Sequence, residues 1–272
     1  MGVGIRKGRS ALEAAGAFVL STSAAADTLV PVGPWRVDYD MAQCVAMREY
    51  GTDEKPLALM LKPSPSGGVM RILVARKGSA EVDQKPAILT LGSEQRRANQ
   101  LEFADAKNHF HVFSVNLPMA DFKAHAQMTE LKWRGGAMNA SFAVTDLPGV
   151  VFELDKCLAD LQDFWNVGEQ FKSRISKEGV STPPLNQLFS GADYPGISIR
   201  SNEQGSVGLT FLVDEKGAIA DCSIDDTSGI PALDTMSCYV ISRRAHFSPA
   251  LGVDGKPTRS AYSRRINWRI AS

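Results

Sequence analysis

The stretch SVGLTFLVDEKGAIADCSI (206–224) constrains the fold most, because apolar residues alternate with smaller or polar ones on both sides of a DEKG turn. This pattern predicts two antiparallel strands with a buried face. From Pro231 the apolar spacing changes to three or four residues, which predicts a helix that begins at this proline. Cys222 lies on the second strand and Cys238 on the helix. A bond between them would fasten the helix to the sheet.

Residues 1–26 have the layout of a secretory signal peptide. A basic start precedes an apolar run from Ala14 to Leu20, and small residues follow at positions 24–26. The uncharged run from Ala14 to Ala26 is shorter than the roughly 20 residues of a membrane-spanning helix. We therefore expect cleavage near Ala26, export to the periplasm, and a mature chain without a membrane span.

The chain has four cysteines, at positions 44, 157, 222 and 238. Disulfides are expected because the periplasm is oxidising, and four thiols allow three connectivities. If the two halves of the chain fold independently, local pairing is the simplest choice, and it joins Cys44 to Cys157 and Cys222 to Cys238. Metal binding is the alternative, but no pair has CxxC spacing and no histidine lies close to a cysteine.

The positions of the turn-forming sequences between the apolar segments predict an α+β protein. Residues 27–165 form a β-rich N-terminal domain of unknown family, since short alternating runs are separated by turn sequences. This region ends in LPGVVFELDKCLADLQDFW (147–165), where an apolar stripe predicts a helix that caps the sheet. Residues 166–190 are expected to be a linker. Residues 191–272 form the small C-terminal domain, with an antiparallel sheet and one packed helix.

Several classes of function have little support. The 30 basic and 30 acidic residues balance, so no basic field is available to hold nucleic acid. Nucleophile-elbow and phosphate-loop motifs are missing, and no cofactor is expected. His109 and His111 lie on one predicted strand face without an evident third ligand, so we expect structural histidines and no metal site. The four tryptophans are expected to be mainly core residues rather than a ligand platform.

The C-terminal residues resemble the C-terminal domain of TonB-type energy transducers. The resemblance covers about 80 residues and depends on the order and spacing of several fragments: YP (194–195), the 206–224 hairpin, SGIPALD (228–234), RRAHFSPA (243–250), DGKP (254–257) and INWRI (266–270). It implies a compact periplasmic module whose hairpin and last strand share one antiparallel sheet. In that family the module binds a short extended segment of an outer-membrane transporter by strand addition.

The resemblance implies that a partner contacts the last strand and a nearby tyrosine. The expected partner-binding residues are Tyr194, Arg264, Arg265, Ile266, Asn267, Trp268, Arg269 and Ile270. An edge strand has unpaired backbone groups that a second chain can satisfy. Arg265 and Arg269 would face acidic residues beside the guest strand. The alternative is that these arginines keep an exposed edge soluble.

The leading hypothesis is therefore a non-catalytic periplasmic protein that docks to a partner by β-strand addition and is linked to energy-coupled transport. The partner is expected to be a periplasmic segment of an outer-membrane transporter or another protein. One alternative is a ligand-binding protein or enzyme based on the N-terminal domain, with the terminal module used for targeting or dimerisation. A homodimer formed through the last strand is the other.

Overall fold

The computed structural model describes residues 27–105 and 109–270. Strands outnumber helices, and the buried apolar residues form two clusters, one built mainly from residues before position 168 and one from residues after position 184. This confirms the expectation of a β-rich α+β protein. The predicted signal peptide, residues 1–26, lies outside the described residues. No described helix has both the length and the apolar character needed to cross a membrane.

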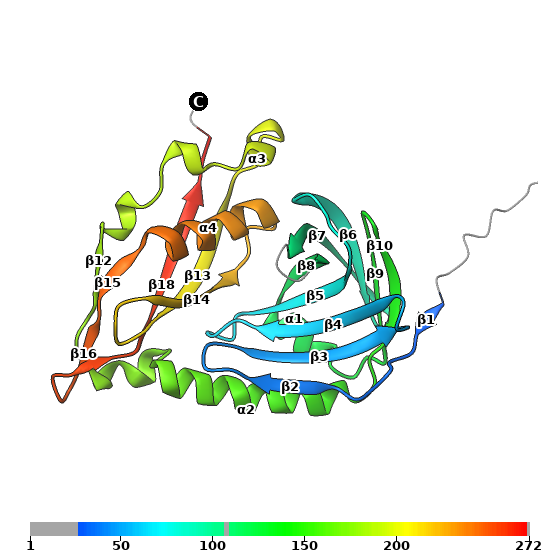
Figure 1. The fold of residues 1–272 in the computed structure, drawn as a ribbon, viewed down its shortest axis with the longest axis horizontal. Coiled ribbons are helices and arrows are strands. Elements are labelled where there is room, and N and C mark those ends of the chain that lie inside the picture. Colours follow the sequence, from blue (N-terminus) through cyan, green and yellow to red (C-terminus); the bar gives the residue numbers. More distant parts are fainter. Residues whose placement is uncertain (1–26, 106–108, 271–272) are drawn as a thin grey trace, which may run out of the picture.

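The first part of the chain forms a ten-stranded sheet, which we call the N-terminal sheet (Figure 1). Its strands in spatial order are β1 (Thr28–Leu29), β10 (Met138–Ala143), β9 (Glu130–Gly135), β6 (Asp83–Leu91), β7 (Glu94–Asp105), β8 (Phe110–Pro118), β5 (Val69–Lys77), β4 (Pro56–Pro63), β3 (Cys44–Gly51) and β2 (Arg36–Tyr39). All neighbours are antiparallel except β1 and β10.

The N-terminal sheet curls until its two ends approach each other (Figure 1). Beyond β1, Pro31 forms an isolated bridge to Tyr50 of β3, and the Val32 amide donates to the Glu49 carbonyl at 2.9 Å. Successive strand residues point alternately into the interior and out of it: in β4, Leu59 and Leu61 are buried, whereas Met60 between them is half-buried. The apolar core therefore lies inside the curled sheet.

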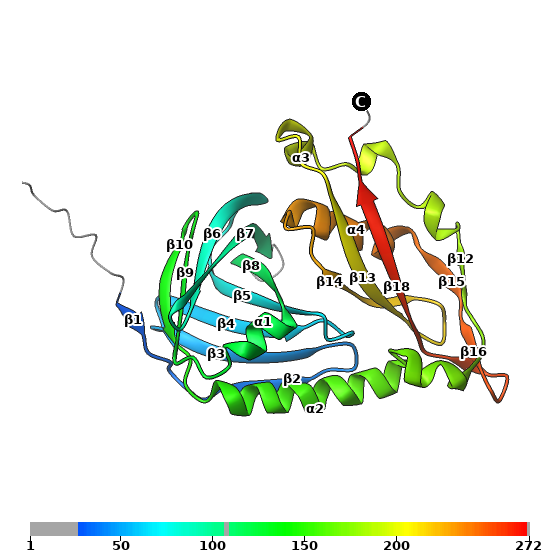
Figure 2. The same cartoon turned by 180° about the vertical axis from the view of Figure 1, so that it is seen from behind.

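Helix α2 (Leu147–Trp165) covers the side of the curled sheet formed by β2 and β3 (Figures 1 and 2). Its apolar stripe is buried as predicted, with Leu154, Leu161 and Trp165 each at most 5% exposed. The Cys44–Cys157 disulfide joins β3 to this helix, which confirms the predicted pairing. A much shorter helix, α1 (Met119–Ala124), follows β8 and buries Phe122 in the same core.

The second part of the chain is built on a three-stranded antiparallel sheet, which we call the C-terminal sheet. Its order is β14 (Ile219–Asp226), β13 (Gly205–Val213) and β18 (Ser260–Trp268), with β13 in the middle. Helix α4 (Pro231–Arg244) packs on one face, and the Cys222–Cys238 disulfide joins it to β14. The predicted hairpin, helix and second disulfide are therefore all present.

The hairpin turn requires a glycine. Gly217 has a φ of +82°, and a Cβ added there would lie 1.8 Å from the Phe247 carbonyl oxygen. Phe247 also holds the turn in place, because its backbone amide donates to the Gly217 carbonyl. One Asp214 oxygen accepts the amides of Lys216 and Ala218. The DEKG sequence therefore fixes both the turn and the strand that follows α4.

The start of α4 is fixed by a buried carboxylate in its first turn. Asp234 is 3% exposed, and it accepts hydrogen bonds from the Thr227 hydroxyl and from the amide and hydroxyl of Ser228. Burial raises the pKa of Asp234, and these hydrogen bonds act in the opposite direction. The loop before Pro231 is therefore held against the helix that it opens, which gives a structural reason for the SGIPALD sequence.

The segment expected to be a linker, residues 166–190, carries secondary structure that the sequence interpretation missed. It contains η1 (Glu169–Arg174), β11 (Ile175–Lys177), β12 (Val180–Thr182) and η2 (Leu185–Gln187). Strand β11 pairs with β16 (Ala250–Gly252), which also pairs with β17 (Pro257–Thr258), and β12 pairs with β15 (His246–Ser248). Three-residue strands are too short to show a period, so composition alone suggested a linker. The elements η3 (Gly191–Asp193) and α3 (Gly196–Arg200) follow before β13.

The middle strand β13 is buried on both faces, where the sequence predicted one buried face. Phe211 and its alternates face α4, but Thr210 and Leu212 on the reverse face are also at most 1% exposed. Leu212 belongs to the N-terminal core cluster, and Ala261 of β18 packs against the same cluster. The reverse face therefore lies against the first part of the chain, a long-range contact that alternation cannot reveal.

Polar side chains also join the two parts of the chain. The Gln84 amide nitrogen of β6 donates to the Glu203 carboxylate at 2.7 Å, and its oxygen accepts the Ala232 amide at 3.0 Å. The Ala232 backbone amide lies in the first turn of α4, where amides have no acceptor within the helix. The Gln84 side chain of the N-terminal sheet therefore caps this helix. At the end of α2, the Asn166 side chain donates to the Arg259 carbonyl at 2.8 Å.

Candidate functional site

The C-terminal sheet has two edges, formed by β14 and β18. An edge strand presents a row of backbone amide and carbonyl groups that a second strand can pair with. Whether either edge can accept a strand depends on what lies beside it. The two edges differ sharply in this respect.

The β14 edge faces the turn between β4 and β5. The Ser66 hydroxyl of this turn donates to the Asp225 carboxylate. Gly68 lies so close that an added Cβ would be 2.7 Å from the Asp225 carbonyl oxygen. Lys62 of β4 also places its Nζ atom 3.6 Å from a carboxylate oxygen of Asp221. The N-terminal sheet therefore covers the β14 edge from Asp221 to Asp225.

The β18 edge is open along its middle. Within residues 27–105 and 109–270, β13 is the one strand that pairs with β18, over Ser260–Trp268 (Figure 2). Ser263, Arg264, Arg265 and Asn267 are all exposed. Successive strand residues point to opposite faces, so three exposed residues in a row show that neither face of this stretch is covered.

A groove runs beside the first half of β18. Its volume is about 330 Å³. Its lining residues come from the segment around β12 and from the strands near α4: Gly179, Val180, Ser181, Pro184, Leu185, Asn186, Phe247, Tyr262 and Arg264. The Gly179 amide donates to the Tyr262 hydroxyl at 2.8 Å, which holds the far wall in place.

Trp268 lies in the packed interior rather than on the open edge, and the half-buried Tyr194 packs against it. Trp268 is 4% exposed, and its indole N–H donates to the Ser237 hydroxyl of α4 at 2.9 Å. The rings of Tyr194 and Phe189 meet it edge-on, with centroid distances of 5.3 and 5.8 Å. The Tyr194 hydroxyl donates to the Glu203 carbonyl. Both predicted partner-binding side chains therefore hold the domain together.

The two strand arginines point in different directions. Arg265 reaches across Gly208 of β13 and places its Nη2 atom 2.8 Å from an Asp226 carboxylate oxygen on β14. Arg264 lines the groove, and its Nη1 atom donates to the Ser263 carbonyl at 2.7 Å. No carboxylate of the described chain lies within 4.0 Å of the Arg264 nitrogens. Of the two arginines on β18, Arg264 is therefore the one that is available to pair with an acidic group of an added partner strand.

The other predicted residues have mixed environments. Ile266 is half-buried against the C-terminal core, and the Asn267 oxygen accepts a hydrogen bond from Ser206 on β13. The strand ends at Trp268, so Arg269 and Ile270 lie beyond it. The Ile270 amide donates to the Gln204 side chain at 3.2 Å. Of the predicted contact residues in this segment, those from Arg264 to Trp268 therefore lie on β18, which spans Ser260–Trp268.

An ion pair that the sequence interpretation missed positions Tyr194, and it joins a buried carboxylate to an exposed arginine. Asp193 is 7% exposed, and its two carboxylate oxygens lie 2.6 and 2.8 Å from the terminal nitrogens of Arg244 at the end of α4. The Arg244 Nη1 atom also donates to the Leu188 carbonyl. These bonds fix the segment that carries Phe189 and Tyr194 against Trp268. The only sequence signal was an acidic residue directly before the Tyr-Pro step.

The histidines supply no metal site within the described chain, which contains no cluster of three or more potential ligands. His109 lies exposed in the turn before β8 with a φ of 57°, so it does not share a strand face with His111 as predicted. His111 is buried, with its Nε2 atom 3.1 Å from Glu102. Trp133, Trp165 and Trp268 are also buried, which confirms the expected packing role for three of the four tryptophans.

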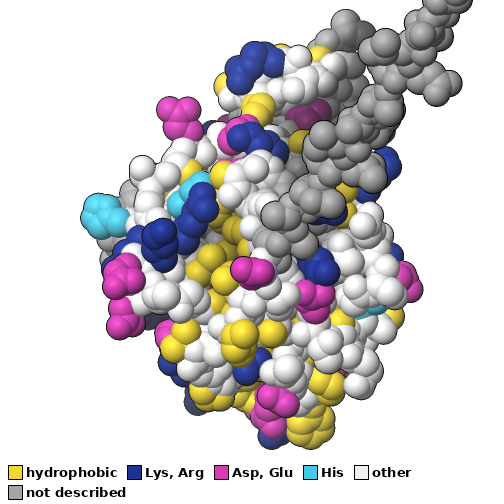
Figure 3. All heavy atoms as spheres, turned by 90° about the vertical axis from the view of Figure 1, so that its right-hand side faces the viewer, with side chains coloured by type: hydrophobic (Ala, Val, Ile, Leu, Met, Phe, Trp, Pro, Cys, Tyr) yellow, Lys and Arg dark blue, Asp and Glu magenta, His cyan; other side chains and the backbone are white. Residues whose placement is uncertain are grey.

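The face of the molecule that Figure 3 shows carries no large patch of a single charge. Figure 3 views the side on which β1 and β10 lie, and there basic and acidic side chains are interspersed wherever described atoms are visible. This agrees with the equal numbers of basic and acidic residues. Long-range steering by a single-sign field is therefore not a feature of this face.

Asp193 should make stability depend on acid pH. Hydrogen bonds from Arg244, followed by those from Ser190, hold the pKa of Asp193 at about 2, below its ordinary value of 3.8, although burial acts in the opposite direction. A depressed folded-state pKa stabilises the fold above the unfolded pKa, and the contribution is lost as pH falls towards the folded value. The difference in unfolding free energy between wild type and Asp193→Asn should therefore be full above about pH 5 and shrink towards pH 2.

Urea denaturation from pH 2 to pH 7 measures this difference, with Asp163→Asn on the exposed end of α2 as the matched control. Asp163 also pairs with an arginine, but both side chains are at least half exposed, so its substitution should have little effect at any pH. A constant difference between wild type and Asp193→Asn across this range would contradict the assigned role.

Comparison with known proteins gives a match for the C-terminal part of the chain. Residues 190–270 match the family model described as Gram-negative bacterial TonB protein C-terminal. The search of curated proteins and the search of solved structures found no match. The matched residues include η3, α3, the whole C-terminal sheet and α4. Residues 190–270 of this chain are therefore similar to the TonB C-terminal family, and the match covers less than half of the chain.

Proposed function

We propose that this chain is an exported, non-catalytic periplasmic protein that binds a partner by adding an extended segment of that partner to β18. The proposed partner is a periplasmic segment of an outer-membrane transporter, and the proposed role is in energy-coupled transport. The observation that carries the proposal is the contrast between the two sheet edges. The β14 edge is covered by the β4–β5 turn, whereas β18 pairs with β13 alone within the described residues.

The match to the TonB family and the paired cysteines support the proposed periplasmic location. Domains of the TonB family are typically periplasmic. All four cysteines of the chain are paired in two disulfides, which are stable in an oxidising compartment. Residues 1–26 supply the proposed export signal, and the proposed cleavage is near Ala26.

The groove beside β18 gives the guest strand a defined place. A strand added to β18 would lie between it and the segment from Gly179 to Asn186, whose residues form the far wall. Backbone pairing would supply affinity, at a net gain of about 0.5–1.5 kcal/mol for each hydrogen bond. Apolar guest side chains would contact Leu185 and Phe247, and an acidic guest side chain would meet Arg264.

Photo-crosslinking tests the proposed contact in the protein as it is exported. A photoreactive residue at Asn267, which is exposed on β18, should capture an outer-membrane transporter when cells are irradiated. The same residue at Lys132, which is exposed on β9 of the N-terminal sheet, is the matched control. Capture of one transporter from position 267 and not from position 132 is the expected result.

Other crosslinking results would contradict the docking proposal or favour self-pairing of β18. Equal capture from both positions, or no transporter from position 267, would contradict the docking proposal. A crosslinked homodimer from position 267 would support self-pairing of β18 in its place, and sedimentation of the mature protein would then give a dimer.

The two strand arginines should contribute unequally to partner binding. Arg264 lines the groove, whereas Arg265 already pairs with Asp226 and reaches away from the open edge. For a peptide of the captured segment that contains an acidic residue, Arg264→Glu should weaken binding by about 2- to 5-fold, because an exposed charge contact contributes up to about 1 kcal/mol.

Fluorescence anisotropy with a labelled peptide measures both variants. Arg265→Glu is the matched control, since it makes the same charge change at the neighbouring position, and it should change the dissociation constant by less than about 2-fold. A larger loss with Arg265→Glu than with Arg264→Glu would show that the guest does not lie in this groove.

A further inference from the structure

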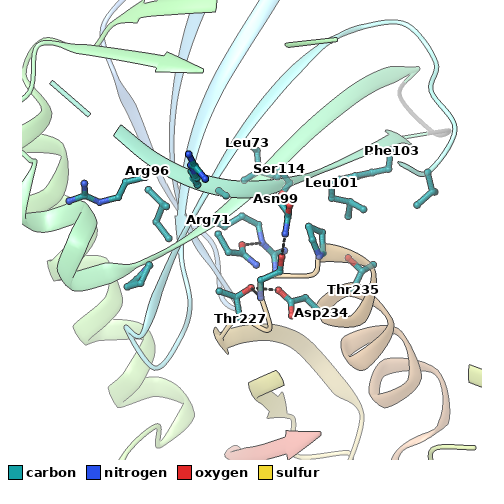
Figure 4. A pocket seen from close by; sticks show the side chains of 18 of the residues that line it. Arg71, Leu73, Arg96, Asn99, Leu101, Phe103, Ser114, Thr227, Asp234 and Thr235 are labelled. Carbon is teal, nitrogen blue, oxygen red and sulfur yellow. Dashed lines mark hydrogen bonds between the residues drawn. The ribbon is translucent and has the colours of Figure 1, made fainter. Parts of the chain in front are cut away.

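A second hollow lies between the outer face of the N-terminal sheet and the start of α4 (Figure 4). Its volume is about 530 Å³, within the range of about 300–1,000 Å³ that is usual for small-molecule sites. Residues of β5, β7 and β8 form one wall, and residues 227–235 form the other. Neither wall is sufficient alone, so the hollow exists because the two parts of the chain pack together.

Arg71 supplies an incompletely paired cation in this hollow. Figure 4 places it among the lining side chains, with Asn99 and Thr227 nearby. Its Nε atom donates to the Asn116 oxygen at 3.1 Å, but its terminal nitrogens have no hydrogen-bond partner within the described chain. No described carboxylate lies within 4.0 Å of these nitrogens. Burial lowers the pKa of Arg71, while the more distant Asp221 and Asp234 act in the opposite direction.

The other charged groups of the hollow are already satisfied or lie at its rim. Arg96 contacts Asp121 at 2.9 Å and Glu94 at 2.8 Å. Asp234 is occupied by its hydrogen bonds within the loop that precedes α4. Arg97 is exposed. Arg71 is therefore the charged group of the interior of the hollow that lacks a direct counter-ion.

The remaining walls are largely apolar. Leu73, Leu101, Phe103 and Pro231 line the hollow, and Val82 lines it while 71% of its surface is exposed. Removal of such surface from water by a ligand is favourable. An arginine fork beside an apolar wall suits a ligand with a charged group at one end and an apolar body.

We propose that this hollow binds a small organic carboxylate with an apolar body, whose carboxylate pairs with the terminal nitrogens of Arg71. A planar carboxylate matches two parallel N–H donors of a guanidinium. A phosphate dianion fits less well, because Asp121 and Asp234 also line the hollow and would repel the second charge. The site goes beyond partner docking and does not depend on the β18 edge.

The ligand would also hold the two parts of the chain together. Near the hollow the Asn99 side chain of β7 already donates to the Gly229 carbonyl of the loop before α4. A ligand that contacts Leu73 or Phe103 on one wall and Pro231 on the other would add to this joint. Binding to the folded state alone raises the unfolding temperature, so a thermal shift should accompany binding.

Calorimetric titration of the mature protein with 2-naphthoate tests the proposal, with uncharged 2-naphthamide as the control probe. The naphthoate should bind and raise the unfolding temperature, and the naphthamide should bind at least about 10-fold more weakly, because a charge-assisted pair contributes roughly 1.5–3 kcal/mol. Arg71→Met should weaken naphthoate binding by about 10- to 100-fold. Arg243→Met, at an exposed position in the last turn of α4, should leave binding unchanged.

Thr235→Trp provides an independent test of the location. Thr235 is exposed and lines the hollow, so a tryptophan there should obstruct it and weaken the binding of both probes. The unfolding temperature without ligand shows whether each variant folds. No binding of naphthoate to wild type at millimolar concentration would overturn the proposal. Equal binding of the two probes, or binding unaffected by both Arg71→Met and Thr235→Trp, would also overturn it.

Discussion

Among residues 27–105 and 109–270, β18 pairs on one side only, and the functional account depends on this constraint. A three-stranded sheet with β13 in the middle has two edges, and the rest of the chain treats them differently. The β4–β5 turn lies against β14, with Ser66 bonded to Asp225 and Gly68 too close to its backbone to tolerate a side chain. An uncovered sheet edge is prone to unwanted pairing, so covering β14 leaves β18 as the edge at which a partner strand can be added.

The first part of the chain thus acts on the C-terminal sheet through direct contacts. Gln84 caps α4, Asn166 bonds the backbone before β18, and Leu212 of the middle strand packs in the N-terminal core cluster. These contacts fix the orientation of β18 relative to α2 and the curled sheet. A partner strand bound at β18 would therefore be held at a set position relative to the whole molecule, and the hollow around Arg71 lies at the same joint.

Local sequence patterns predicted much of this fold. The alternation in residues 206–224 and the change of period after Pro231 predicted the hairpin and α4, and the grouping of cysteines predicted both disulfides. Strands β11 and β12 escaped prediction because they are three residues long and depend on partners near position 250. The burial of Leu212 escaped it because its neighbours belong to the other part of the chain.

The candidate site was predicted less completely, since strand residues of one sequence can point to an edge, a face or a core. Trp268 is bonded to Ser237 in the interior, and Arg265 pairs with Asp226 across a glycine. Neither partner could be identified without the register of the three strands. The hollow beside Arg71 could not be predicted at all, because its walls come from segments far apart in the sequence.

Amide hydrogen exchange in β18 tests the central claim most directly. The mature protein would be compared with and without a peptide of the partner segment captured from position 267. In a strand paired on one side, alternate amides lack a strand partner. The account predicts that the peptide slows exchange of alternate amides between Ser260 and Trp268 and leaves β14 unchanged. Slowed exchange in the N-terminal sheet with no change in β18 would contradict it.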